Sequence, residues 1–130
     1  MKESDAQKQI MDWLRLYRIF HYRQNTGGMS GAYKGKRWFV RFAKPGAPDI
    51  IAVVNGLYVG IEVKASDGKQ SDKQREFQAE LEAAQGVYIL ARNAADVEAK
   101  LGPMLRDGTA KKFVAERVLG HSGESHEAKS

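Results

Sequence analysis

The chain has 130 residues and a net charge of +5 at pH 7, and it contains no cysteine. This length suits a single domain with a modest core, and the missing cysteines exclude disulfides and thiolate metal sites. No stretch resembles a signal peptide or a membrane span, so a cytoplasmic protein is expected, and its basic balance suits a polyanionic partner such as nucleic acid.

A helix is predicted near the N-terminus, from Ser4 to about Arg18. Ser4, followed three residues later by Gln7, has the form of a capping box at a helix start. Apolar residues then recur at helical spacing and define one buried stripe, which consists of Ala6, Ile10, Trp13, Leu14 and Tyr17. Residues 19–23 follow directly and are predicted to form a strand.

Residues 25–36 contain four glycines and show no periodicity, so they are predicted to form a mobile loop. A second strand is expected over residues 37–43, and the glycines and prolines of residues 44–48 end it. Basic side chains surround this loop with Tyr33 and Trp38 between them, which indicates contact with a nucleic-acid backbone and stacking on bases. The alternative is an ordinary solvated loop, and for Trp38 a place in the core is preferred.

Residues 49–64 form the clearest predicted element, a β-hairpin around Asn55-Gly56. The two-residue turn fixes the register, which places Asp49 directly opposite Glu62. One face of the hairpin is entirely apolar and should enter the core: it contains Ile50, Ala52, Val54, Leu57, Val59, Ile61 and Val63. The other face carries Lys64 beside the two carboxylates.

Two carboxylates directly opposite each other destabilise a strand pair and raise the pKa of one of them. A divalent cation would remove the conflict between Asp49 and Glu62, and hard oxygen ligands suit Mg²⁺ or Mn²⁺. Gly60 on the same face leaves room for a ligand. The alternative is that both are solvated charges at strand ends, each neutralised by a lysine or arginine, and a bulge would separate the pair.

Beyond this hairpin, a polar loop over residues 65–70 leads to a helix from Ser71 to about Gln85, which Gly86 should end at its C′ position. Residues 87–91 are predicted as a short buried strand. Asn93 should cap a third helix over residues 94–101, which Gly102-Pro103 ends. A further short helix around residues 109–119 and a frayed tail complete the chain.

The order of these elements is typical of the mixed α/β class. We expect one domain over residues 1–106, with a central mixed β-sheet flanked by helices. A C-terminal extension over residues 107–130 is expected to be partly helical and then frayed.

The motif Pro48-Asp49 … Glu62-Val63-Lys64 resembles PD-(D/E)xK, the signature of a large nuclease superfamily. The likeness extends to further positions, and in them the chain resembles the VRR-Nuc family (virus-type replication-repair nucleases). These positions are Gly46 to Ile50, Ile61 to Lys64, Gly68, Ser71, Gln74 and Gly86, together with Glu3 on the first helix and the segment Arg23-x-Asn25. The length is similar to that of the stand-alone, phage-type members.

The resemblance implies a restriction-endonuclease-like core and metal-dependent hydrolysis of DNA phosphodiesters. By matched positions, Asp49, Glu62 and the backbone carbonyl of Val63 would bind Mg²⁺ or Mn²⁺, and Lys64 would orient or activate the attacking water. Glu3 would either complete the metal site or serve as a charge near the helix start. Gln74 would either contact Lys64, water or phosphate, or only close its capping box.

The residues expected to contact DNA are Arg23, Asn25, Lys34, Lys36, Arg37, Arg41, Lys69 and Lys73. Of these, Lys69 and Lys73 flank the active-site end and would hold phosphate at a helix start. The resemblance further implies a homodimer that acts on branched DNA such as four-way (Holliday) junctions, in the host cytoplasm if the protein is phage-encoded. A non-branch-specific or restriction-type endonuclease and a catalytically lapsed DNA-binding module are the alternatives.

Overall fold

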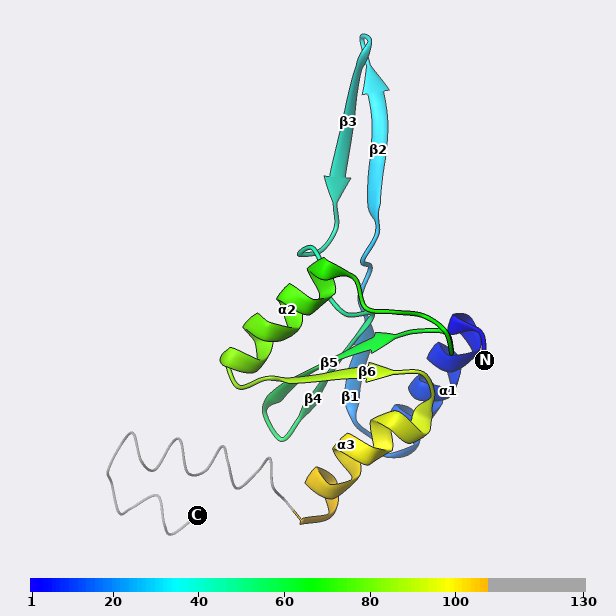
Figure 1. The fold of residues 1–130 in the computed structure, drawn as a ribbon, viewed down its shortest axis with the longest axis vertical. Coiled ribbons are helices and arrows are strands. Elements are labelled where there is room, and N and C mark those ends of the chain that lie inside the picture. Colours follow the sequence, from blue (N-terminus) through cyan, green and yellow to red (C-terminus); the bar gives the residue numbers. More distant parts are fainter. Residues whose placement is uncertain (108–130) are drawn as a thin grey trace, which may run out of the picture.

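Four strands form one mixed sheet, and two further strands form a separate hairpin that projects from the body (Figure 1). The computed structural model describes residues 1–107, so the helix and tail expected further on lie outside the described residues. The sheet has the order β1 (Phe20–Arg23), β4 (Ile50–Val54), β5 (Leu57–Val63) and β6 (Val87–Ala91). Its first three strands are antiparallel neighbours and β6 joins β5 in parallel, which confirms a mixed sheet.

The hairpin of β4 and β5 has the register that its turn predicts. Asn55 and Gly56 have φ angles of 49° and 89°, the positive values that favour Asn-Gly at a two-residue turn. The predicted apolar face is buried along its whole length. The ladder ends at the pair of Ile50 with Ile61, so Asp49 lies in the bend just before β4 rather than inside the strand.

Helices cover both faces of the sheet. The core is formed by the apolar face of the hairpin and by α1 (Glu3–Leu16) and α3 (Ala94–Asp107), which contribute Ala6, Ile10, Leu14, Val97 and Leu101. The helix α2 (Asp72–Ala83) lies on the opposite face, where Leu81 packs beside Gly60. None of these helices, which lie within residues 1–107, is long and apolar enough to cross a membrane.

The start of α1 and the end of α3 differ from their predicted positions. The capping box at Ser4 is wrong, because α1 already begins at Glu3 and Lys2 occupies the N-cap without a side-chain hydrogen bond. Asn93 caps α3 as predicted, with its Oδ1 accepting from the N–H of Asp96 at 2.9 Å. The helix continues past Pro103, because the buried side chains around it favour helix enough to outweigh a cost of about 3 kcal/mol for an interior proline.

The capping box of α2 at Ser71 and Gln74 is confirmed, whereas the end of this helix is built differently from the prediction. Gln85, not Gly86, adopts the left-handed conformation, with a φ of 71°. The N–H of Gly86 donates to the carbonyl of Leu81 at 2.9 Å, which makes a Schellman-type end. Gly86 is needed for space, because a Cβ there would lie 2.3 Å from Leu81 Cδ1.

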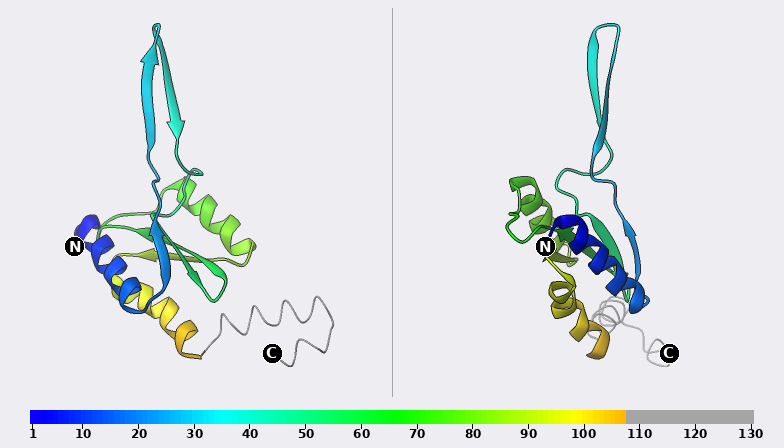
Figure 2. Two further views of the ribbon diagram at one scale, coloured as in Figure 1. Left: turned by 180° about the vertical axis from the view of Figure 1, so that it is seen from behind. Right: turned by 90° about the vertical axis from the view of Figure 1, so that its right-hand side faces the viewer.

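The largest difference from the prediction lies between residues 24 and 44, a segment that we call the arm. Instead of a loop, its first half contains β2 (Gly28–Tyr33), which pairs with β3 (Lys36–Arg41) across a turn at Lys34-Gly35. The expected second strand exists as β3, but among the described strands it pairs with β2 alone and not with the central sheet. Figure 2 shows the hairpin of β2 and β3 standing clear of the three helices, and Trp38 is therefore 42% exposed rather than in the core.

Candidate active site

Asp49 is fixed at the open end of the β4–β5 hairpin by one hydrogen bond to its side chain and one to its backbone carbonyl. Its Oδ2 accepts a hydrogen bond from the backbone N–H of Val63 at 2.9 Å. Its backbone carbonyl accepts from the N–H of Gln24 at 2.7 Å, at the foot of the arm. The carboxylate therefore lies beside the last residues of β5, where the sequence places Glu62 and Lys64.

Glu62 is a buried carboxylate that is only half satisfied. It is 3% exposed, and Gln74 Nε2 donates to its Oε2 at 2.8 Å. Lys64 Nζ lies 3.7 Å from the same oxygen. The other oxygen, Oε1, is buried and has no hydrogen-bond partner among residues 1–107. Because an unsatisfied buried oxygen costs free energy, Oε1 is the atom of this site with most to gain from a ligand.

The electrostatics of Glu62 follow from this burial. The pKa of Glu62 is raised to about 8, mainly by loss of solvent and next by the negative charge of Asp49, while the ammonium of Lys64 opposes the shift. The expected effect of two neighbouring carboxylates on one pKa is therefore present, although desolvation is the larger cause. Without a cation, much of the Glu62 population carries a proton at neutral pH.

Gln74 closes the capping box of α2, which is one of the two predicted alternatives, and its other contact is with Glu62 rather than with the predicted Lys64. Its Oε1 accepts from the N–H of Ser71 at 2.8 Å, which closes the capping box of α2. Its Nε2 donates to Glu62, so the same amide links the start of the helix to the buried carboxylate. The helix start and the position of Glu62 are thereby coupled.

Lys64 is held by the loop that follows β5. Its side chain is 17% exposed, so most of it is packed against protein. Gly68 allows the loop to close on its aliphatic stem, since a Cβ at Gly68 would lie 3.2 Å from Lys64 Cβ. Arg92 donates to the carbonyl of Gly68 at 2.7 Å and fixes the loop there. The ammonium is thus positioned next to Glu62 rather than free in solvent.

The two carboxylates open into a pocket of about 550 Å³ whose walls are basic. Arg41 and Lys73, two of the predicted DNA contacts, line it, and so does Lys44, which the sequence reasoning missed. Lys44 is paired with Glu80 at 3.3 Å and Lys73 with Glu76 at 3.5 Å, both on the surface. Exposed pairs contribute little to stability, so these cations can turn to a phosphate at small cost.

The other residues predicted to contact DNA are dispersed. Arg23 and Asn25 line a second pocket, of about 400 Å³, that also reaches Asp49. Lys69 is exposed in the loop after Lys64. The remaining three, Lys34, Lys36 and Arg37, lie at the turn and in the first residues of β3. They belong to the hairpin that projects from the body in Figure 1.

Glu3 does not belong to a cluster of three possible metal ligands in the described part of the chain. Across residues 1–107, no three His, Cys, Asp or Glu side chains come together in a way that could hold a metal ion. Glu3 is exposed in the first turn of α1, where an acidic residue favours the helix dipole, and it influences Glu62 through its charge. Its place agrees with the alternative of a charge near the helix start.

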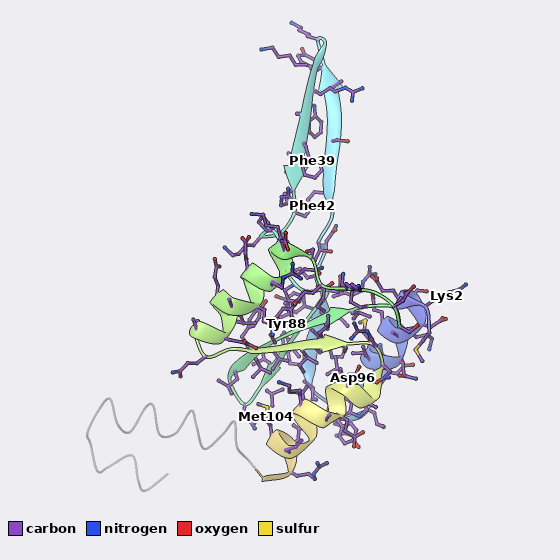
Figure 3. The ribbon with its side chains drawn as sticks, viewed as in Figure 1. Lys2, Phe39, Phe42, Tyr88, Asp96 and Met104 are labelled. Carbon is purple, nitrogen blue, oxygen red and sulfur yellow. The ribbon has the colours of Figure 1, made fainter. Side chains whose placement is uncertain are left out.

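Tyr88 is a neighbour of the site that the sequence did not indicate. It pairs with Gly60 on the face that α2 covers (Figure 3). Its hydroxyl is buried and has no hydrogen-bond partner in the described part of the chain. Burial raises the pKa of Tyr88 to about 12, and nearby Gln70 opposes the shift. No local signal could have found it, because Val87–Ala91 is uniformly apolar apart from this hydroxyl.

The donor set fits a hard divalent cation. Mg²⁺ needs only one or two carboxylates, because water and substrate phosphates complete its shell. Asp49 and Glu62 supply two, and the unpartnered Oε1 of Glu62 supplies an oxygen with no competing protein donor. A cation would also relieve the repulsion and desolvation that raise the Glu62 pKa.

Neither a protein-family model nor a curated protein matches the chain. The likeness to VRR-Nuc nucleases therefore rests on the motif residues alone and stays a prediction.

Gly46 fixes the wall of the pocket against α2, which gives a first prediction. Its φ is 80°, and a Cβ there would lie 2.1 Å from the carbonyl oxygen of Lys73. We expect Gly46→Ala to lower the free energy of unfolding by about 3 kcal/mol, the sum of left-handed strain and overpacking. Chemical denaturation measures this loss.

The matched control is Gly35→Ala at the tip of the arm. Gly35 has nearly the same φ of 79°, but a Cβ there would meet nothing within 4 Å. It should cost about 1 kcal/mol or less. Equal losses in the two variants would show that the contact with α2 is unimportant.

Proposed function

We propose that the protein is a Mg²⁺- or Mn²⁺-dependent deoxyribonuclease with a restriction-endonuclease-like core, similar to the stand-alone VRR-Nuc nucleases. The observation that carries this proposal is the meeting of Asp49, half-satisfied Glu62 and Lys64 at one end of a hairpin, where the two carboxylates line a basic pocket. A structural ion pair alone would not need a second carboxylate or leave a buried oxygen unpaired.

In this proposal, Asp49, Glu62 and the Val63 carbonyl would hold the cation. A bound cation would neutralise phosphate charge and make hydroxide available at neutral pH. Lys64 orients the attacking water through its ammonium and offsets the charge that develops on the phosphate. Gln74 keeps Oε2 of Glu62 occupied, and Oε1, which has no protein donor among residues 1–107, would be the oxygen that binds the cation.

The basic side chains of the pocket wall would bind the substrate. Arg41, Lys44 and Lys73 surround the two carboxylates and suit the phosphates on either side of a scissile bond. By resemblance, the substrate is branched DNA such as a four-way junction, and a homodimer would supply one site for each of two strands. The rivals are an endonuclease without branch preference and a DNA-binding module that has lost cleavage.

A cleavage panel tests these possibilities together. The chain is incubated with Mg²⁺, and separately with Mn²⁺, on a four-way junction, a flap, a linear duplex and a single strand, with EDTA as the blank. We expect metal-dependent cuts in the branched substrates before the linear duplex. Equal cutting of the duplex would favour the non-branch-specific enzyme, and binding without any cutting would favour the lapsed module.

A further inference from the structure

The arm carries the entire net charge of the chain. Residues 24–44 contain five basic residues and no Asp or Glu; the five are Lys34, Lys36, Arg37, Arg41 and Lys44. Removing these five from the 21 Lys and Arg of the chain leaves 16, which equals the 16 Asp and Glu. The rest of the molecule is therefore neutral by formal charge, and the attraction for a polyanion is concentrated on the arm.

The register of the arm divides it into two unlike faces. Cross-strand partners share a face, so Arg37, Phe39 and Arg41 lie on one face, opposite Ala32, Ser30 and Gly28. We call these three residues of β3 the Arg-Phe-Arg strip. Their partners on β2 are all small, so nothing on that strand covers the strip. The other face is mostly apolar and contains Met29, Tyr33, Lys36, Trp38 and Val40.

The ring of Phe39 packs against the backbone of β2 and remains exposed to solvent. It lies across Gly28, because a Cβ on that glycine would be only 2.3 Å from Phe39 Cζ. The residue is nevertheless 58% exposed, in the middle of a projecting hairpin and far from the core (Figure 3). The guanidinium carbon of Arg41 lies 5.5 Å from the ring centre. A fixed aromatic plane between two arginines suits a ligand that has both flat rings and negative charge.

The strip leads into the active-site pocket. Arg41 belongs to the strip and also lines the pocket of Asp49 and Glu62, together with Thr26 from the segment that precedes β2. A polyanion that follows the strip toward the body therefore reaches the two carboxylates. An acidic protein would match the charge of the arm but would leave the exposed ring without a function.

We propose that the Arg-Phe-Arg strip binds single-stranded nucleic acid. Phe39 stacks on an unpaired base, and Arg37 and Arg41 contact the phosphates on either side. This deepens the proposed function, on which it rests for DNA as the ligand, since a branched substrate presents unpaired bases beside a strand to be cut. The arm then selects DNA with unpaired bases and guides it to the pocket.

The test measures binding by fluorescence anisotropy in EDTA, so that no cleavage interferes. Phe39→Leu keeps an apolar side chain but removes the aromatic plane. We expect it to weaken binding of a labelled single strand by about tenfold, the range that stacking of one base supports. A linear duplex of the same length, whose bases are already stacked, should lose about twofold or less.

The arginines are tested through the salt dependence of binding. Arg37→Ala with Arg41→Ala should reduce the slope of log affinity against log salt on the single strand by about 1.4, which corresponds to two lost phosphate contacts. The matched control is Lys100→Ala with Arg106→Ala, which removes the same charge from exposed positions on α3. The control should leave the slope as in the wild type.

Several outcomes would contradict the proposal that the Arg-Phe-Arg strip binds single-stranded nucleic acid. Phe39→Leu could bind the single strand as the wild type does, or it could lose the duplex equally. It could also change the oligomeric state in sedimentation without changing affinity, which would make this face an interface between copies. These outcomes are distinguishable from failure of the nuclease: a chain that cuts DNA normally but is insensitive to Phe39→Leu keeps its proposed function and loses only the strip.

Discussion

Asp49→Asn is expected to abolish strand cleavage and the metal-dependent rise in melting temperature together. In the wild type, Mg²⁺ or Mn²⁺ at about 100 times its dissociation constant should stabilise the fold by about 2.7 kcal/mol through mass action. The amide can still accept the hydrogen bond from Val63, so the backbone geometry should survive while the negative charge is lost. Cleavage should fall by on the order of 10³-fold or more.

The control for this experiment is Lys64→Ala, which should separate binding from chemistry. Lys64 is not one of the proposed ligands, so the thermal shift with metal and the binding of DNA should remain. Cleavage should be lost, because the ammonium near the attacking water is gone. Absence of any metal-dependent shift in the wild type would refute the metal site, and cleavage by Lys64→Ala at the wild-type rate would refute the role of Lys64.

The second large effect concerns pH and needs no assumption about DNA. In EDTA, the free energy of unfolding should fall as the pH rises from about 5 to about 8. Glu62 has a pKa of about 8 in the folded protein against an ordinary 4.5, so the folded state keeps a proton that the unfolded state releases. The stabilising contribution of Glu62 is complete below the unfolded-state pKa of 4.5 and is lost as the pH rises through the folded-state pKa of about 8. The loss in the free energy of unfolding is on the order of a few kcal/mol.

Denaturation at several pH values, with Glu62→Gln beside the wild type, measures this effect. Glutamine cannot ionise, so the variant should lose the slope and become the more stable protein near pH 8. Tyr88 does not interfere, because its pKa of about 12 lies above this range. Persistence of the same slope in Glu62→Gln would assign the titration to another group.

The parts of the fold that the sequence predicts are those decided by neighbouring residues. Asn55-Gly56 determines its own turn and so the register of β4 and β5, and Ser71 with Gln74 determines the start of α2. The approach of Asp49 to the end of β5 follows from that register, which explains why the centre of the candidate site could be anticipated.

The parts that could not be predicted depend on contacts made at a distance. β2 could not be recognised from its sequence because it is rich in glycine. Its pairing with β3 is made by the backbone, and its packing is supplied by the aromatic rings of β3. The length of α3 is decided by burial of Leu101 and its neighbours against the sheet rather than by Pro103. Lys44 and Tyr88 reach the neighbourhood of the carboxylates only through the folded chain.

The separation of the arm from the body has an evolutionary consequence. β2 and β3 pair with each other and with no strand of the central sheet, so substitutions along them leave the packing of the three helices unchanged. Asp49, Glu62 and Lys64 are constrained by burial and by each other, whereas residues 28–40 of the arm are constrained mainly by their own ladder. Selection can therefore lengthen, shorten or recode residues 28–40 while Arg41, Lys44 and the carboxylates of the pocket are inherited intact.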